Sequence, residues 1–120
     1  MSEIITPANV ERRLVELSSE LDTATEELNA SEHLYYQSKT TYEITLASKR
    51  LEIAGELKGT KSTVSEREDM ALVQCEDYAY ELATAEATVK AARANVSRIR
   101  TQIDIARSLG TSVRSAYEMA

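Results

Sequence analysis

The sequence lacks the large aromatic residues Phe and Trp and has few of the residues that form tight turns. Its 120 residues include no Phe and no Trp, and only three Gly, one Pro and one Cys. Such a composition, rich in Ala, Leu, Glu, Ser, Thr and Arg, is typical of helices and not of sheets. A single Cys also excludes an internal disulfide, so we expect Cys75 to be a small buried side chain in a reducing compartment.

Residues that carry chemistry are scarce as well. The sequence has no glycine-rich phosphate loop and only one His, and its carboxylates follow no spacing that singles out a pair. We therefore expect no catalysis, no cofactor and no metal site. No apolar run reaches the length of a membrane span and no signal-peptide pattern is present, which favours a cytoplasmic protein without a membrane partner.

What the sequence does contain is a heptad pattern in its second half. Apolar or small residues recur seven apart in two series, which are Cys75, Leu82, Val89, Val96 and Ile103, and Tyr78, Ala85, Ala92, Ile99 and Ala106. Such a seam is typical of a helix that packs lengthwise on another helix. The predicted fold class is all-α, a long antiparallel helical hairpin that is coiled-coil-like, with a short C-terminal helix, and that assembles into a homo-oligomer.

Local signals predict where the helices begin and end. Thr6 followed by Pro7 is a helix start, and Thr63 opens a capping box after the one convincing turn. Gly110 indicates a C-terminal stop, and a capping pattern near 29–31 leaves open a break in the first helix. A single helical domain, residues 1–120, is predicted, with helices over residues 7–57, 64–108 and 111–119.

Charge alternates along the chain, although its net value is −6. The net charges are −6, +2, −6 and +4 for residues 1–32, 33–61, 62–86 and 87–120. The first basic segment holds a cluster near the turn: Lys39, Lys49, Arg50, Lys58 and Lys61. The cluster is either a solvated charged face or a local site that attracts phosphates. Tyr36 lies upstream and can stack on unpaired bases, whereas Tyr35 and Tyr42 fall at seam positions.

A row of arginines flanks the seam of the second helix: Arg93, Arg100, Arg107 and Arg114. A turn near residue 60 places residue i opposite residue 120 − i, so in one interpretation Arg93 pairs with Glu27 and Arg100 with Glu20. In the other interpretation the row lines a groove or a ring lumen and meets phosphates. Both interpretations stay open, and Arg107 and Arg114 have no obvious acidic partner.

Three features follow one another in residues 35–120. Lys49-Arg50-Leu51-Glu52 precedes Gly55 and Gly59, the segment from Ser62 to Glu66 opens the second helix, and an apolar helix ends in Ser108-Leu109-Gly110 before an amphipathic tail. In this order and spacing the chain resembles the phage recombination mediators of the UvsY type. The resemblance implies a ring-like homo-oligomer, a hexamer or a heptamer, that binds single-stranded DNA in the cytoplasm of a phage-infected bacterium.

The resemblance also implies partners and residue roles. Such mediators help to load a RecA-like recombinase onto strands coated by a single-strand-binding protein. Their basic pair near the end of the first helix contacts DNA, and this role carries over to Arg50 more directly than to Lys49, because the two bases are adjacent here. Ile53 and Ala54 replace the tandem aromatic residues of the family. The residues expected to hold the oligomer are Val96, Ile99, Ile103, Ala106, Leu109, Val113 and Tyr117.

We therefore expect a single-stranded DNA-binding recombination mediator whose nucleic-acid-binding residues are the five bases of the cluster near the turn. The first alternative is a structural coiled-coil phage protein, in which every charge sets helix pairing and no DNA is bound. The second alternative is an adaptor whose acidic faces bind a basic protein. A measurement of oligonucleotide binding separates the DNA-binding mediator from the structural coiled-coil protein.

Overall fold

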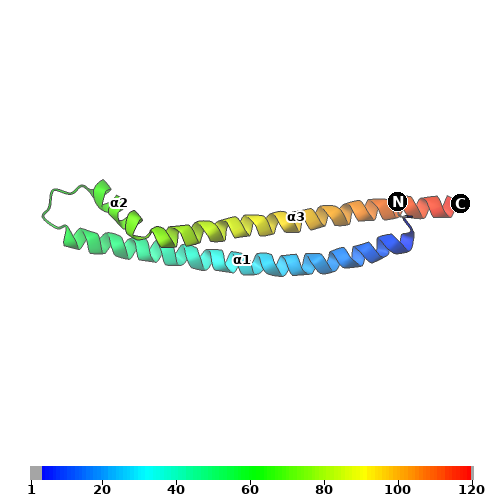
Figure 1. Ribbon diagram of the computed structural model, residues 1–120, viewed down its shortest axis with the longest axis horizontal. Helices are drawn as coiled ribbons and strands as arrows, with labels where there is room; N and C mark the ends of the chain where they lie inside the picture. Colours follow the sequence, from blue (N-terminus) through cyan, green and yellow to red (C-terminus); the bar gives the residue numbers. More distant parts are fainter. Residues whose placement is uncertain (1–3, 120) are drawn as a thin grey trace. The chain divides into compact units, whose positions relative to one another are not determined.

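The computed structural model describes residues 4–119, which form three helices and no strand (Figure 1). Helix α1 spans Pro7–Glu56, α2 spans Val64–Gln74 and α3 spans Glu76–Met119. The prediction of an all-α chain is confirmed. Packing divides the described chain into two compact units, where the sequence predicts a single domain. We call residues 4–29 and 91–119 the terminal unit and residues 30–90 the turn unit.

Helix α1 begins as its sequence predicts. The Thr6 hydroxyl accepts a hydrogen bond from the amide of Asn9 at 3.2 Å, and Pro7 occupies the first turn, where its missing N–H costs nothing. The helix is continuous across residues 29–31, so the interruption that the capping pattern left open is absent. It ends at Glu56, one residue before the predicted end.

The connection from α1 to α2 depends on one glycine and one capping box. Gly59 has a φ of 83°, a left-handed conformation that side chains other than glycine rarely adopt. Thr63 then caps α2, because its hydroxyl accepts from the amide of Glu66 at 3.1 Å while the Glu66 carboxylate accepts from the amide of Thr63 at 3.5 Å. The predicted start of the second helix is therefore confirmed.

Removing this cap is expected to weaken the turn unit. Thr63→Ala deletes the hydroxyl that accepts from the Glu66 amide, so the free energy of unfolding should fall by about 0.5–2 kcal/mol. Thr88→Ala is the matched control, because the exposed Thr88 hydroxyl only donates to the carbonyl of Thr84 within α3. The measurement is urea unfolding followed by circular dichroism. Equal midpoints for the two variants would show that the capping box contributes nothing.

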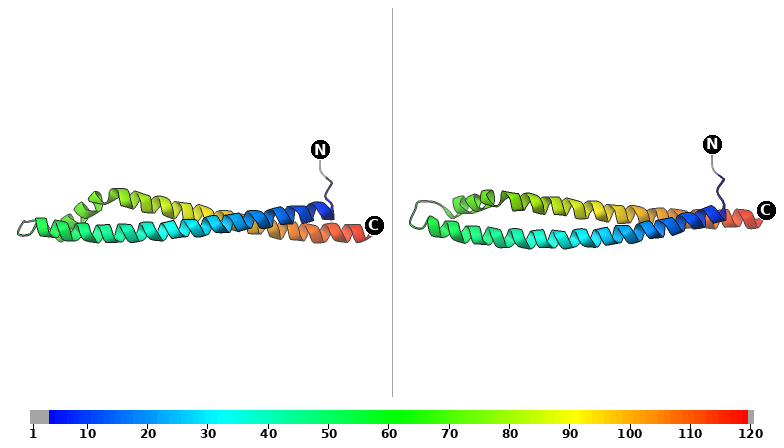
Figure 2. Two further views of the ribbon diagram at one scale, coloured as in Figure 1. Left: turned by 90° about the horizontal axis from the view of Figure 1, so that it is seen from below. Right: turned by 60° about the horizontal axis from the view of Figure 1, so that its bottom comes forward.

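The structure breaks the predicted helix 64–108 at Cys75. Cys75 has φ −103° and ψ 15°, and its amide donates to the carbonyls of Ala71 and Leu72, both at 3.1 Å. If the helix were straight, the residue seven before Cys75 would also lie in the buried seam. That residue is Glu68, an acid that is exposed in the structure. Figure 2 shows the bend between α2 and α3 at this point.

Each unit has its own apolar core. In the terminal unit α1 packs antiparallel on α3 and buries Leu17, Ala24, Val96, Ile99, Ile103 and Ala106. In the turn unit the core consists of Leu46, Ile53, Ala71 and Cys75, with Tyr42 and Leu57 packed against it. Cys75 is fully buried, as the sequence predicts.

Gly110 is not the helix stop that the sequence suggests. Helix α3 runs through it to Met119, so the separate helix predicted over 111–119 does not exist. Gly110 is buried, and a Cβ atom placed on it would lie 3.0 Å from Cγ1 of Val10. The glycine therefore allows the two helices to approach closely, and the pair Val10 and Gly110 follows the predicted register of i with 120 − i.

Candidate nucleic-acid interface

All five basic residues of the predicted site lie in the turn unit, three on α1 and two in the connection that follows it: Lys39, Lys49, Arg50, Lys58 and Lys61. Four of them are exposed, and Lys49 is partly buried. Residues 11 apart on a helix lie about 20° apart around its axis, so Lys39 and Arg50 share one flank of α1.

Lys49 does not belong to that flank. Its side chain lies about 100° around the helix from that of Arg50. Its ammonium Nζ lies 3.2 Å from Oε2 of Glu52, so Lys49 is paired with an acid of its own helix. The structure thus separates the two residues of the predicted DNA-contacting pair and favours Arg50, the member to which the family's role carries over more directly.

Arg50 instead shares a cavity with a residue that sequence reasoning missed. A cavity of about 260 Å³ in the turn unit is lined by Arg50 and Ala54 from α1 and by Val64, Arg67 and Glu68 from α2. Among residues 4–119, neither arginine forms an ion pair. With two arginines and one acid, Glu68, the lining carries a net positive charge. Two arginines at one cavity can bind a phosphate together, because each guanidinium group offers several N–H donors in a rigid fork.

Arg67 is held in place by the start of α2. Its Nε donates to the carbonyl of Thr63 at 3.3 Å, which leaves its terminal nitrogens without a hydrogen bond to other described residues. The net charge of each sequence segment did not point to Arg67, because it is the one basic residue in the acidic segment 62–86. The available signal was its place one helical turn after the N-cap Thr63, next to the end of α1.

An exposed tyrosine completes this surface. Tyr36 is 59% exposed and lies three residues before Lys39, so the two side chains are neighbours on α1. Its ring packs edge-on against the Tyr35 ring, with centroids 5.3 Å apart, whereas Tyr35 and Tyr42 are partly buried at seam positions. We call Tyr36, Lys39, Arg50 and Arg67 the Arg50 flank.

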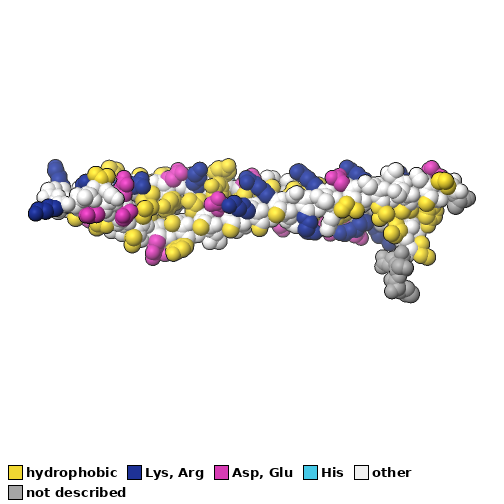
Figure 3. Space-filling view, turned by 90° about the horizontal axis from the view of Figure 1, so that it is seen from above, with side chains coloured by type: hydrophobic (Ala, Val, Ile, Leu, Met, Phe, Trp, Pro, Cys, Tyr) yellow, Lys and Arg dark blue, Asp and Glu magenta, His cyan; other side chains and the backbone are white. Residues whose placement is uncertain are grey.

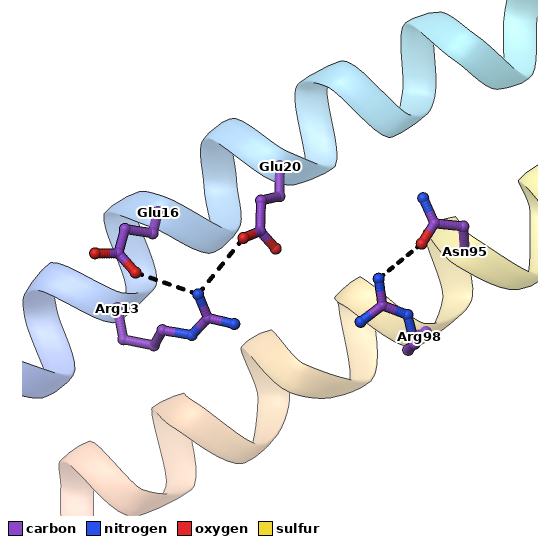
Figure 4. A network of polar contacts seen from close by, with 5 residues as sticks. All are labelled: Arg13, Glu16, Glu20, Asn95 and Arg98. Atoms are coloured by element: carbon purple, nitrogen blue, oxygen red, sulfur yellow. Dashed lines mark hydrogen bonds and ion pairs between the residues drawn. The ribbon is translucent and has the colours of Figure 1, made fainter.

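Glu20, the acid predicted to neutralise Arg100, lies on the other side of the seam from that arginine. Glu20 and Glu27 line a groove of about 470 Å³ in the terminal unit together with Asn95 and Arg98, and Arg100 is not part of it. Figure 4 shows that Glu20 pairs with Arg13. Nη1 of Arg13 lies 3.5 Å from the Glu20 carboxylate and 3.2 Å from the Glu16 carboxylate. The predicted pair of Arg100 with Glu20 is therefore wrong.

Arg98 faces this groove and is also bonded within its own helix. Its Nη2 donates to Oδ1 of Asn95 at 2.8 Å (Figure 4). The groove thus combines Arg13 and Arg98 with the carboxylates of Glu20 and Glu27. With cations and acids in equal number, it offers no net attraction to a polyanion.

The residues expected to hold the oligomer fall into two groups. Val96, Ile99, Ile103 and Ala106 are buried by α1 of the same chain, so in this arrangement they are not available to another subunit. Val113 and Tyr117 continue the seam and Leu109 lies beside it; Leu109 and Tyr117 are 40% and 54% exposed. Of the seven residues expected to hold the oligomer, this second group is the one that offers apolar surface to a partner.

Other classes of site find no residues in the described part of the chain. Residues 4–119 contain no group of three or more His, Cys, Asp and Glu side chains placed to hold a metal ion. None of the three described helices is sufficiently long and apolar to cross a bilayer.

Comparisons with protein-family models, with curated proteins and with solved structures found no match. A functional assignment therefore depends on the residues themselves, and above all on the Arg50 flank.

Proposed function

We propose that the chain binds single-stranded nucleic acid through the Arg50 flank and acts as a recombination mediator. The observation that carries the binding proposal is the cavity in which Arg50 of α1 and Arg67 of α2 lie together. A phosphate between two guanidinium groups gains charge-assisted hydrogen bonds from both helices. Ala54 and Val64 line the same cavity and offer apolar contact to a sugar or a base.

The rest of the flank suits a strand whose bases are unpaired. Tyr36 presents an exposed ring on which a base can stack, and Lys39 beside it can meet the adjoining phosphate. Stacking and phosphate contacts do not read base edges, so we expect little sequence preference. The net charge of −6 repels a polyanion elsewhere, which confines binding to local basic surfaces.

The test is fluorescence anisotropy of a labelled oligothymidine at several salt concentrations. Arg50→Gln with Arg67→Gln should raise Kd at least tenfold at low salt. Because each phosphate contact contributes a slope of about 0.7 on single strands, the double variant should lower the slope of log Kd against log salt by roughly 1.4. The matched control is Arg12→Gln with Lys90→Gln, which removes the same charge from two exposed positions outside the flank.

Two results would overturn the binding proposal. One is a wild-type protein that does not bind the oligonucleotide at low salt. The other is an equal loss of affinity in the control and in the Arg50 and Arg67 variant, which would show that only net charge matters.

The mediator role rests on the resemblance to the UvsY-type proteins and needs its own readout. The wild-type protein should speed the assembly of a RecA-like recombinase on strands coated with a single-strand-binding protein, and the Arg50 and Arg67 variant should not. Repetition of the flank around an oligomer would strengthen a weak site by multivalency. Binding without faster recombinase assembly would leave a strand-binding protein and remove the mediator role.

One observation favours a structural coiled-coil protein as the second candidate. Ile44 and Leu51 lie seven apart on α1 and are 63% and 76% exposed, on the side of the helix away from the buried Leu46 and Ile53. Such a stripe is typical of a surface that packs on another helix. A protein with this function alone would form an oligomer in light scattering and leave the anisotropy of the oligonucleotide unchanged.

A further inference from the structure

Three arginines of α3 lie outside the Arg50 flank and are not used by it: Arg100, Arg107 and Arg114. They belong to the terminal unit, and all three are exposed. A spacing of seven residues places them on one face of the helix, about 10.5 Å from each other along its axis. We call them the arginine row. In Figure 3, which looks onto the α3 side, Lys and Arg side chains recur along the visible surface.

The packing of the terminal unit separates this row from Glu20, the acid predicted to pair with Arg100. The groove lined by Glu20, Glu27 and Asn95 lies on one side of the seam, and Arg100 follows the seam residues Val96 and Ile99 on the other side. On the side of Arg100, the positions of α1 next to its buried seam residues hold Glu11, Ser18 and Thr25.

Consequently Arg100 and Arg107 form no ion pair within residues 4–119, and Arg114 bonds only a backbone carbonyl, that of Gly110 at 3.3 Å. The coiled-coil interpretation, in which flanking charges set helix pairing, therefore does not account for Arg100 or Arg107. Asp104 lies between them on the helix and also forms no ion pair among the described residues.

Hydroxyl groups and two acids surround the row. On α3 the exposed positions beside it include Asp104 and Glu118 and the hydroxyl residues Ser97, Thr101, Ser108, Thr111 and Ser115. The hydroxyls of Thr101 and Thr111 donate to the carbonyls of Ser97 and Arg107, which orients them along the helix. Guanidinium groups with hydroxyls beside them are the groups that most often contact phosphate oxygens.

We infer that the arginine row is a second phosphate-binding surface, which holds the backbone of the same single-stranded nucleic acid. This inference rests on the proposed function, and it assigns a new site to it in the terminal unit. The row extends about 21 Å along α3 from Arg100 to Arg114, which spans several nucleotides of a strand. It carries no exposed aromatic residue between its arginines, so it grips the backbone and leaves base stacking to Tyr36.

The linkage of two sites by one strand makes the inference measurable. When a strand is bound at the Arg50 flank, the arginine row meets its phosphates at a high effective concentration. The loss of either surface should therefore weaken the binding of a long oligothymidine, and the loss of both should nearly abolish it.

The experiment compares six proteins with a labelled 40-nucleotide oligothymidine by anisotropy at several salt concentrations. The first four are the wild type, Arg100→Gln with Arg107→Gln, Arg50→Gln with Arg67→Gln, and the control Arg12→Gln with Lys90→Gln. The fifth combines the four arginine substitutions of the two sites, and the sixth is Arg100→Lys with Arg107→Lys. We expect the row variant to raise Kd about tenfold and to lower the salt slope by roughly 1.4. Arg100→Lys with Arg107→Lys should restore most of the affinity, because it restores the charge. Unchanged thermal unfolding by circular dichroism checks that these exposed substitutions keep the fold.

The outcomes separate the two proposals. If the row variant binds with wild-type affinity while the Arg50 and Arg67 variant loses affinity, the arginine row is not a binding surface and the proposed function stands. A wild-type protein that does not bind the strand would remove both. Competition with polyglutamate at equal charge should displace the strand only weakly; equal displacement would show that the row binds acidic protein and would overturn its assignment to nucleic acid.

Discussion

Leu17→Ala is expected to lower the free energy of unfolding by about 2–5 kcal/mol, one of the two largest effects of any single substitution proposed for this chain. Leu17 is 1% exposed and lies in the core of the terminal unit with Ala24, Ile99 and Ile103. The removal of its isobutyl group leaves a cavity between two helices whose backbones are held by the remaining contacts. Small domains are stable by only about 5–15 kcal/mol, so the loss is a large fraction of the total.

Val15→Ala provides the matched comparison for this prediction. Val15 lies two residues earlier on α1 and is 72% exposed, so its truncation should change stability by less than about 0.5 kcal/mol. Urea unfolding followed by circular dichroism measures both variants, and amide hydrogen exchange locates the loss in the terminal unit. A similar midpoint for the Leu17 and Val15 variants would mean that Leu17 is not covered by α3 in solution.

The sequence predicted the helices well because their signals are local and periodic. The seven-residue spacing of Val96 and Ile103 identified side chains that are 5% and 8% exposed, and the capping box at Thr63 placed the start of α2 at the correct residue. The bend at Cys75 was missed, because no glycine or proline marks it. An uninterrupted heptad would also place Glu68 at a seam position, which is seen only when the seam is extended backwards.

The candidate site was predicted only in part. Charge along the sequence located Lys39 and Arg50 in a basic segment, but it could not tell that Lys49 is paired with Glu52 or that Arg67 joins Arg50 in a cavity. Both facts depend on the angular position of residues around a helix and on the place of α2 beside α1. The pairing of Arg100 with Glu20 was wrong for the same reason, since a register of i with 120 − i gives the level of a residue but not its side of the seam.

Gly110→Leu is expected to destabilise the chain by about 1–3 kcal/mol, while the same exchange at Gly55 leaves stability unchanged or raises it by up to about 1 kcal/mol. Both glycines lie in helices, so both substitutions gain helix propensity. The two positions differ in the room available for a side chain. A Cβ on Gly110 would lie 3.0 Å from Cγ1 of Val10, whereas a Cβ on Gly55 meets nothing within 4 Å. Unfolding midpoints in urea give the comparison directly.

A double-mutant cycle with Val10 then separates a close contact from a helix stop. If Gly110 allows α1 and α3 to approach, Val10→Ala should relieve part of the cost of Gly110→Leu, and the two substitutions together should cost less than the sum of each alone. If Gly110 served instead to end a helix, Val10 would not matter and the Gly110 and Gly55 variants would behave alike. Additive costs, or equal midpoints at the two glycines, would therefore contradict the close packing of Val10 on Gly110.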